Sequence, residues 1–290
     1  MISTSDHLIS REKTALLEFK SIQYRKTILS LIYSAKAGHT GGSLSCVDIL
    51  NVLYNQTMNI TTKNFAEIDR DHYVHSKGHS VEALYAVLLD QGFYTIDELN
   101  TIEKYNSPFI GHPTRSIPGI EQNTGALGHG LSISVGMALA AKMDHRDNRV
   151  FTIMGDGELT EGSIWEASAS AANYKLDNLV AIVDRNTLQI SGRTENVMAM
   201  ESLDEKFSAF GFAVRHVDGN NVEELAALFD TLPFEKEKPN LVLAHTIKGK
   251  GISFMEDNVG WHHRVPTDEE YALAIQELDL AEQKVENSNG

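Results

Sequence analysis

The stretch that decides the fold is residues 149–192, RVFTIMGDGELTEGSIWEASASAANYKLDNLVAIVDRNTLQISG. It contains two short apolar runs rich in β-branched residues, 150–154 and 179–183, which are typical of buried strands. Between them, residues 159–174 are rich in Ala and Ser and predict a helix with small faces suited to close packing. A strand, a helix and a second strand at this spacing predict a βαβ unit with parallel strands and a right-handed crossover.

The flanking sequence extends this unit in both directions. On the C-terminal side we expect strands at 213–217 and 240–246, separated by a helix near 222–232. On the N-terminal side, mostly helical intervals between apolar residues predict helices over 7–36, about 45–57 and about 80–91. The sequence therefore predicts an α/β fold, a doubly wound and mainly parallel sheet flanked by helices.

No linker divides this pattern, so we expect one domain over residues 1–290. Its N-terminal segment, 7–37, would be helical and would stop at Gly38. Its polar end, VENSNG at 285–290, would be a frayed tail.

The composition disfavours several classes of protein. A formal charge of −15 argues against binding nucleic acid or an anionic membrane surface, because both attract clustered Lys and Arg. The single cysteine, Cys46, excludes an internal disulfide and a cysteine-based zinc site. The polar start lacks the apolar core of a signal peptide, and no apolar run reaches the ~18 residues of a membrane helix. We therefore expect a cytoplasmic protein that binds neither nucleic acid nor membrane.

A candidate metal and phosphate site lies at the ends of the two central strands. The motif Gly-Asp-Gly at 155–157 follows the first strand and Asn186 follows the second, so both reach the carboxyl edge of the sheet, where ligands bind. The glycines allow a phosphate to approach closely, and the next helix start offers unpaired N–H groups. The Asp156 carboxylate, the Asn186 amide oxygen and a nearby backbone carbonyl form an oxygen-ligand set that suits Mg²⁺. Either motif alone is more often a turn or a loop cap, and only their joint position indicates a site.

Several of the twelve histidines follow a glycine, namely His39, His79, His112 and His129. A histidine in such a turn is usually a surface residue or a satisfied hydrogen-bonding group. A group of them can instead serve proton transfer and bind anionic or hydroxylated substrates. Zinc is the competing interpretation, but no pair shows the i, i+4 spacing within a convincing helix and thiolate ligands are absent.

Taken in order, these motifs resemble the N-terminal, diphosphate-binding part of a transketolase over roughly residues 20–266. A Gly-Asp-Gly motif at one strand end and an asparagine at the next are the signature of thiamine diphosphate enzymes. The segments that are similar to transketolase in particular are AKAGHTGGSLS (35–45), HSKGHSVEALYAVL (75–88), GHPTRSIPGIEQNTGALGHGLS (111–132) and HTIKGKGISFMEDNVGWHHRVP (245–266).

The resemblance implies roles for individual residues. The metal, Mg²⁺ with Ca²⁺ or Mn²⁺ as substitutes, would be held by Asp156, the Asn186 side chain and the Leu188 carbonyl. Thiamine diphosphate would be backed by Gly157, and the other positions that contact it would be His79, Gly125, Leu127 and His262. The catalytic groups that stabilise oxygens and move protons on the sugars would be His39, His79, His112 and His262. Glu161 would join a carboxylate link to a second active site, although an acidic helix start is a compatible interpretation.

Three positions leave alternatives open. His129 stands where one-chain transketolases often have glutamine, and histidine there is more similar to split or 1-deoxyxylulose-5-phosphate synthase-like relatives. His263 stands where a small residue is expected, and we interpret it as a solvent-facing neighbour of His262. Lys248 and its neighbour Lys250 could reach phosphate, or they could lie in a solvated loop.

The resemblance also implies a missing half. In this family, a pyrimidine-binding domain supplies the glutamate that protonates the cofactor's aminopyrimidine ring and the arginines that grip the sugar phosphate. That domain would follow residue 290, so we expect the first subunit of a split transketolase, or else a truncated piece. Its partner would be a pyrimidine-binding C-terminal subunit, in an α₂β₂ assembly.

The expected reaction is transfer of a two-carbon ketol unit from a ketose or ketose phosphate to an aldose or aldose phosphate. One alternative is half of a 1-deoxyxylulose-5-phosphate synthase-like enzyme, which begins with pyruvate decarboxylation. Another is a non-catalytic cofactor-binding or assembly module. The intact Asp156, Asn186 and candidate histidines argue against the module, because a degenerate site is expected to lose some of them.

Overall fold

The structure, a computed structural model, describes residues 9–289. Its α-helices are α1 (Arg11–Ala35), α2 (Thr40–Val52), α3 (Val81–Asp90), α4 (Ile96–Leu99), α5 (His129–Met143), α6 (Gly162–Asn173), α7 (Thr194–Val197), α8 (Leu203–Phe210), α9 (Val222–Phe229) and α10 (Asp268–Asn289). Its strands are β1 (His72–His75), β2 (Val150–Gly155), β3 (Leu179–Arg185), β4 (Leu188–Gln189), β5 (Gly192–Arg193), β6 (Ala213–Asp218) and β7 (Asn240–His245). Shorter turns of 3₁₀ or π helix are η1 (Leu53–Thr57), η2 (Gly78–Ser80), η3 (Gly157–Thr160) and η4 (Val259–Trp261).

Five parallel strands form the central sheet, in the order β1-β2-β3-β7-β6. The predicted βαβ unit is present, because β2 and β3 pair in parallel and α6 connects them. Their register sets Gly155 beside Asp184, and β7 continues the same edge with Ala244 beside Asp184. The ends of three neighbouring strands are therefore aligned, so the loops that follow them start from one edge of the sheet.

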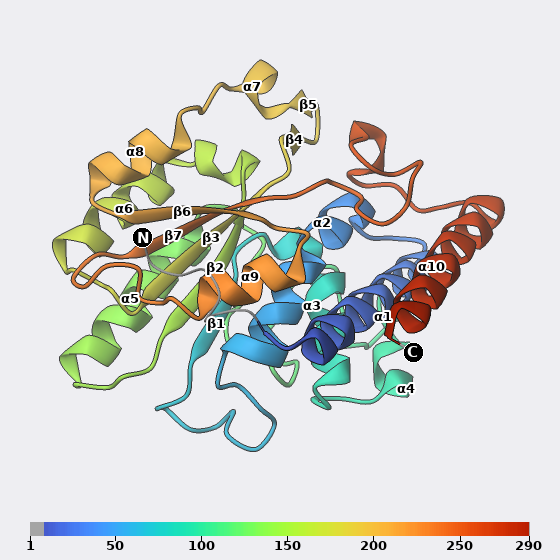
Figure 1. The fold of residues 1–290 in the computed structure, drawn as a ribbon, viewed down its shortest axis with the longest axis horizontal. Helices are drawn as coiled ribbons and strands as arrows, with labels where there is room; N and C mark the ends of the chain where they lie inside the picture. Colours follow the sequence, from blue (N-terminus) through green and yellow to red (C-terminus); the bar gives the residue numbers. More distant parts are fainter. Residues whose placement is uncertain (1–8, 290) are drawn as a thin grey trace.

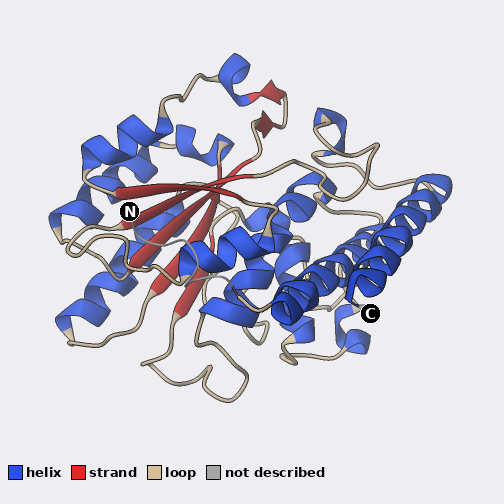
Figure 2. Cartoon of the chain, in the orientation of Figure 1, coloured by secondary structure: helices blue, strands red, loops and turns tan. Residues whose placement is uncertain are grey.

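Helices cover both faces of this sheet, which confirms the predicted doubly wound α/β fold (Figure 1). Side chains of a strand point alternately to its two faces. Along β2, Phe151 and Ile153 pack with α1, α2, α3 and α9, whereas Val150 and Met154 pack with α5, α6 and α8. Figure 2 shows the resulting three layers, with the strands between the two groups of helices.

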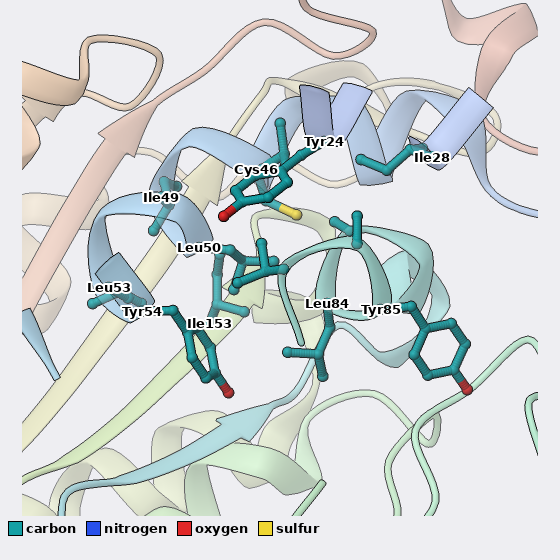
Figure 3. Packing of buried hydrophobic residues seen from close by; sticks show 14 of the residues in the cluster. Tyr24, Ile28, Cys46, Ile49, Leu50, Leu53, Tyr54, Leu84, Tyr85 and Ile153 are labelled. Carbon is teal, nitrogen blue, oxygen red and sulfur yellow. The ribbon is translucent and has the colours of Figure 1, made fainter. Parts of the chain in front are cut away.

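The helix α2 is the most thoroughly buried of those next to the site, since all its residues are buried. Its Cys46, Ile49 and Leu50 lie among side chains of α1, α3 and β2, including Leu84 and Ile153 (Figure 3). The chain enters α2 directly from the first glycine–histidine turn. A rigid core therefore fixes the start of α2 at the edge of the sheet.

The ends of the chain differ in part from the sequence-based expectation. Helix α1 begins at Arg11, where the Ser10 side chain accepts a hydrogen bond from the Lys13 N–H, and residues 7 and 8 lie outside the described residues. At the other end, residues 285–289 are helical rather than frayed. The reason is that Ala281 and Val285 continue the helical spacing of apolar residues and pack against the core, along α1 (Figure 1).

Three elements near the site have no counterpart in the sequence-based prediction. The first is β1, which is only four residues long and has a histidine at each end. The second is α5, whose apolar residues alternate with Gly and Ser and show no strong helical stripe. The third is β4, of only two residues, which pairs with β5 in a separate antiparallel sheet. In the part of the chain that is described, no helix has the length and apolar character needed to cross a membrane.

Candidate active site

A pocket of about 310 Å³ opens at the carboxyl edge of the sheet, beyond the ends of β2, β3 and β7. It brings together nine of the eleven residues for which the sequence predicts a role. These are His39, His79, Gly125, Leu127, Asp156, Gly157, Asn186, Leu188 and His262. The remaining two, His112 and Glu161, lie outside its wall and are described below.

The carboxylate of Asp156 is almost fully buried at the end of β2, with 3% of the residue exposed. Its Oδ1 accepts a hydrogen bond from the Gly157 N–H at 2.8 Å. Its Oδ2 accepts from the Thr187 N–H at 2.6 Å and from Arg185 at 2.9 Å. Burial and the nearby Asp184 raise the pKa of Asp156, and the Arg185 guanidinium opposes that rise. An additional cation at this carboxylate would offset the cost of its burial.

Two further oxygens of the predicted metal set are also in the pocket wall. The Asn186 Oδ1 accepts a hydrogen bond from the Leu188 N–H at 3.1 Å, which fixes the orientation of the amide. The Leu188 carbonyl accepts one from the Lys248 ammonium at 3.2 Å. A carboxylate, an amide oxygen and a backbone carbonyl therefore line one wall, as the oxygen-ligand hypothesis requires.

Lys248 does not lie in a solvated loop. It is buried in the pocket wall, and its Nζ lies 2.7 Å from Nδ1 of His262. Burial lowers its pKa to about 8, and the neighbouring Lys77 ammonium adds to this effect. Of the two interpretations that the sequence leaves open, the structure favours the one in which this lysine can reach a bound anion.

Histidine side chains from three other segments gather around His39. The distances from its ring centroid are 5.2 Å to His79, 6.3 Å to His112, 5.7 Å to His262 and 4.5 Å to His263. His263 is exposed, as the sequence interpretation expects, but it also packs against His39. The cluster therefore contains one more imidazole than the four predicted.

The inner imidazoles of this cluster are neutral at pH 7. Burial is the main reason that the pKa of His39 falls to about 4 and that of His262 to about 3. The pKa of His79 is also well below its usual value, because of burial and the Lys77 ammonium. Neutral imidazoles can both donate and accept a proton, which suits proton transfer to and from hydroxyl groups.

These depressed pKa values predict a loss of stability in acid. Between pH 6.5 and about 4, the His39 imidazole takes up a proton in the unfolded chain but not in the folded one. The free energy of unfolding therefore decreases as the pH is lowered through this range. The fall should be shallower in His39→Gln. Urea unfolding at several pH values across this window measures it, with the exposed His129→Gln as a matched control. If the free energy of unfolding depended on pH equally steeply in the parent and in His39→Gln, the lowered pKa of His39 would be contradicted.

His112 and Glu161 lie at the margin of the site. A Cβ on Gly125 would come within 2.6 Å of the His112 ring, and Gly125 has φ +138°, so only glycine fits between this ring and the pocket. Glu161 is exposed at the start of α6, and its side chain does not cap that helix. The structure thus places Glu161 on the surface of the chain rather than among the histidines.

Sequence reasoning missed several buried polar groups of the site. Glu158 is 2% exposed, and its carboxylate accepts hydrogen bonds from the Ser76 hydroxyl and from the Gly128 and Gly155 N–H groups. It therefore joins the loops that follow β1 and β2 to the turn before α5. Its place beside the Gly-Asp-Gly motif is a sequence signal, but an acidic residue there is equally typical of a solvated helix start.

The Gln189 side chain is a second group that was missed. Within residues 9–289, its buried Nε2 has no hydrogen-bond partner, and the residue lines the pocket. A Cβ on Gly157 would come within 2.8 Å of its Cγ. This donor and the adjacent glycine form a small cradle of the kind that accepts an anion.

The fold and site together define a class: an α/β domain with a pocket at the carboxyl edge of a parallel sheet, lined by a buried carboxylate, an amide and a cluster of histidines. Residues 21–285 match the family described as the transketolase, thiamine diphosphate binding domain. The chain therefore belongs to this family, and the predicted family is confirmed.

Similar proteins agree with this assignment. One subunit of an apulose-4-phosphate transketolase of Phocaeicola vulgatus is 48% identical over 94% of this chain and 97% of its own length. A 6-deoxy-6-sulfo-D-fructose transketolase subunit of a Clostridium species is 40% identical over 91% of this chain and 96% of its own length. A solved transketolase of Leishmania mexicana superposes with a TM-score of 0.81 at 25% identity, covering 97% of this chain but 46% of that one. The chain thus spans less than half of that one-chain transketolase and nearly all of the two subunits.

Proposed function

We propose that this chain is the thiamine diphosphate- and Mg²⁺-binding subunit of a two-subunit transketolase, which transfers a two-carbon ketol unit from a ketose to an aldose. Residues 1–290 would form one diphosphate-binding domain. The observation that carries the proposal is the pocket in which an oxygen-ligand set meets a cluster of neutral histidines. The names of the relatives favour transketolase over 1-deoxyxylulose-5-phosphate synthase-like chemistry and over a non-catalytic module.

The chemistry of the donors fits Mg²⁺. The Asp156 carboxylate, the Asn186 Oδ1 and the Leu188 carbonyl would hold the ion, and the diphosphate and water would complete its six oxygen ligands. Mn²⁺ or Ca²⁺ could substitute, since both also bind oxygen ligands.

The groups next to this oxygen-ligand set fit a diphosphate. Gly157 would back the diphosphate, and its lack of a Cβ admits the Gln189 side chain, whose unpaired Nε2 can donate to a phosphate oxygen. Lys248 brings a positive charge. His79, with Gly125 and Leu127, would line the rest of the cofactor. When bound, thiamine diphosphate would supply a nucleophilic carbon and an electron sink for carbon–carbon cleavage.

The histidines would donate protons to, and accept protons from, the oxygens of the two sugars. The Lys248 ammonium donates to Nδ1 of His262, so the proton of the neutral ring is on Nε2, from which His262 can donate to a substrate oxygen. His39, His79 and His112 would also contact substrate hydroxyls from within this cluster. Burial in this cluster keeps bulk water away and strengthens these hydrogen bonds.

A partner subunit would complete the site. We propose a pyrimidine-binding C-terminal subunit in an α₂β₂ assembly, supported by the word "subunit" in the names of the relatives and by the half-length match to a one-chain enzyme. Exposed apolar side chains at the pocket side of the chain, Ile190, Val197 and Met198, are suited to being covered by it. The exposed Glu161 is free to join a carboxylate link across such an interface.

The substrates would be sugar phosphates or sugars with a similar anionic group. The relatives' names refer to apulose 4-phosphate and to 6-deoxy-6-sulfo-D-fructose, which carry a phosphate and a sulfonate group, respectively. The compartment would be the cytoplasm, with neither nucleic acid nor membrane as a partner, in keeping with the charge of −15.

Ketol transfer should need both subunits. With Mg²⁺ and thiamine diphosphate, we expect the chain co-purified with a candidate pyrimidine-domain subunit to be more than about 100-fold more active than the chain alone, because the partner would supply part of the acid–base groups. The assay supplies xylulose 5-phosphate or apulose 4-phosphate as one sugar and an aldose phosphate as the other. Equal activity from the chain alone would overturn the claim that a partner completes the site.

A further inference from the structure

The guanidinium of Arg185 links the site to a loop outside the pocket. It lies at the end of β3, between Asp184 and Asn186, and its side chain is 8% exposed. Its NH1 donates to Oδ2 of Asp156 at 2.9 Å and to the Thr194 hydroxyl at 2.8 Å. On its other side, Nε and NH2 donate to Oε1 of Glu201 at 3.1 and 2.6 Å. One side chain therefore bridges a carboxylate of the cofactor pocket and the segment that joins α7 to α8.

The hydrogen bonds of Asp156 leave few positions for a cation. An ionised carboxylate has about four lone-pair sites, two on each oxygen. The N–H of Thr187 and the NH1 of Arg185 occupy both sites of Oδ2, whereas within the described residues Oδ1 accepts a single bond, from the Gly157 N–H. The lone pair that remains for a metal ion is therefore on Oδ1.

From this geometry we infer that Arg185 is the positioning residue of the metal centre, resting on the proposed role of Asp156 as a ligand. It holds Oδ2 so that Asp156 presents one oxygen, and one orientation, to the cation. Single-oxygen coordination suits the small octahedral shell of Mg²⁺. Partners that orient a metal ligand in this way commonly account for about 10- to 100-fold in metal affinity.

The segment from Thr194 to Glu201, which begins with α7, holds the Arg185 guanidinium in place. The Glu195 carboxylate accepts hydrogen bonds from the Met200 and Glu201 N–H groups, which close the loop on itself. The other oxygen of Glu201 accepts from the Leu203 N–H at 3.0 Å, at the start of α8. Because NH1 of Arg185 is bound to Asp156 and NH2 is bound to Glu201, the guanidinium has little freedom to turn away from Asp156.

The test measures the affinity of the full chain for Mn²⁺ with saturating thiamine diphosphate, from the EPR signal of the free ion. Arg185→Met should weaken Mn²⁺ binding by about 10- to 100-fold. Arg185→Lys, which keeps the charge but cannot bridge both carboxylates, should lose less. The matched control is Arg215→Met, because Arg215 is an exposed arginine on β6 that pairs at 3.8 Å with Glu235.

The outcomes separate this inference from the proposed function. Mn²⁺ binding by Arg185→Met at the affinity of the parent would overturn the positioning role. If that variant fails to fold, Arg185→Lys decides, since parental affinity overturns the inference and a partial loss supports it. Parental Mn²⁺ affinity in Asp156→Asn would instead show that the carboxylate is not a ligand, which overturns the proposed metal site itself.

Discussion

Lys77→Met is expected to lower the free energy of unfolding by about 3–5 kcal/mol, the usual cost of breaking a buried ion pair. The Lys77 ammonium pairs with Asp184, and the two side chains are 1% and 0% exposed. Burial alone would raise the pKa of Asp184, but the Lys77 ammonium holds this pKa below its usual range. Methionine fills a similar volume but leaves the carboxylate with the uncharged hydroxyls of Ser45 and Thr246 as its side-chain partners. Urea unfolding at about pH 7 gives the change directly.

Two variants make this prediction specific. Lys77→Met combined with Asp184→Asn should recover part of the loss, because it removes the uncompensated charge as well as its partner. Lys238→Met, which breaks the exposed pair with Glu235, should change stability little. A loss in Lys77→Met no larger than that in Lys238→Met would show that the buried pair is not needed for stability.

The central strands could be predicted from sequence because their residues are apolar on both faces. In β2 and β3 every residue is buried, so the apolar runs are continuous and end sharply at polar residues. Topology then brings Asp156 and Asn186 to the same edge, since parallel neighbours end on the same side. That step needs no knowledge of side-chain contacts, which is why the oxygen-ligand pair could be found from the residues.

The buried charges could not be predicted in the same way. Lys77 and Asp184 are far apart in sequence, and each alone has the composition of a surface residue. Their pairing depends on β1, whose four residues, HYVH, give no clear strand signal. Burial of Glu158 likewise depends on backbone N–H groups from separate loops.

For the histidine cluster, the sequence pattern and the family resemblance predicted different things. The glycine–histidine pairs indicated several turns, but only the resemblance to transketolase gathered His39, His79, His112 and His262 at one centre. The structure brings these four together and adds His263, because the two consecutive histidines that follow η4 both contact His39. A single sequence cannot distinguish that neighbour from an ordinary solvent-facing residue.

Asp156→Lys is expected to abolish Mg²⁺-dependent binding of thiamine diphosphate, with a loss well beyond the roughly 100-fold that removal of an outer partner of a ligand can cause. The change removes an oxygen ligand and puts an ammonium in the place of a carboxylate that pairs with Arg185 and would hold the metal, so it repels both cations. Isothermal titration of the cofactor with and without Mg²⁺ measures the effect in the chain and in its complex with the partner subunit.

Because a lysine buried beside Arg185 could also disrupt the fold, Asp156→Asn is the variant that isolates the ligand. Asparagine keeps the shape and can still accept the Thr187 N–H bond through its amide oxygen, but it brings no negative charge to the cation. We expect it to unfold at a temperature close to that of the parent while losing most of the Mg²⁺ dependence of cofactor binding. Undiminished Mg²⁺-dependent binding in this folded variant would mean that the ion is held elsewhere, and the oxygen set at the end of β2 and β3 would then need another purpose.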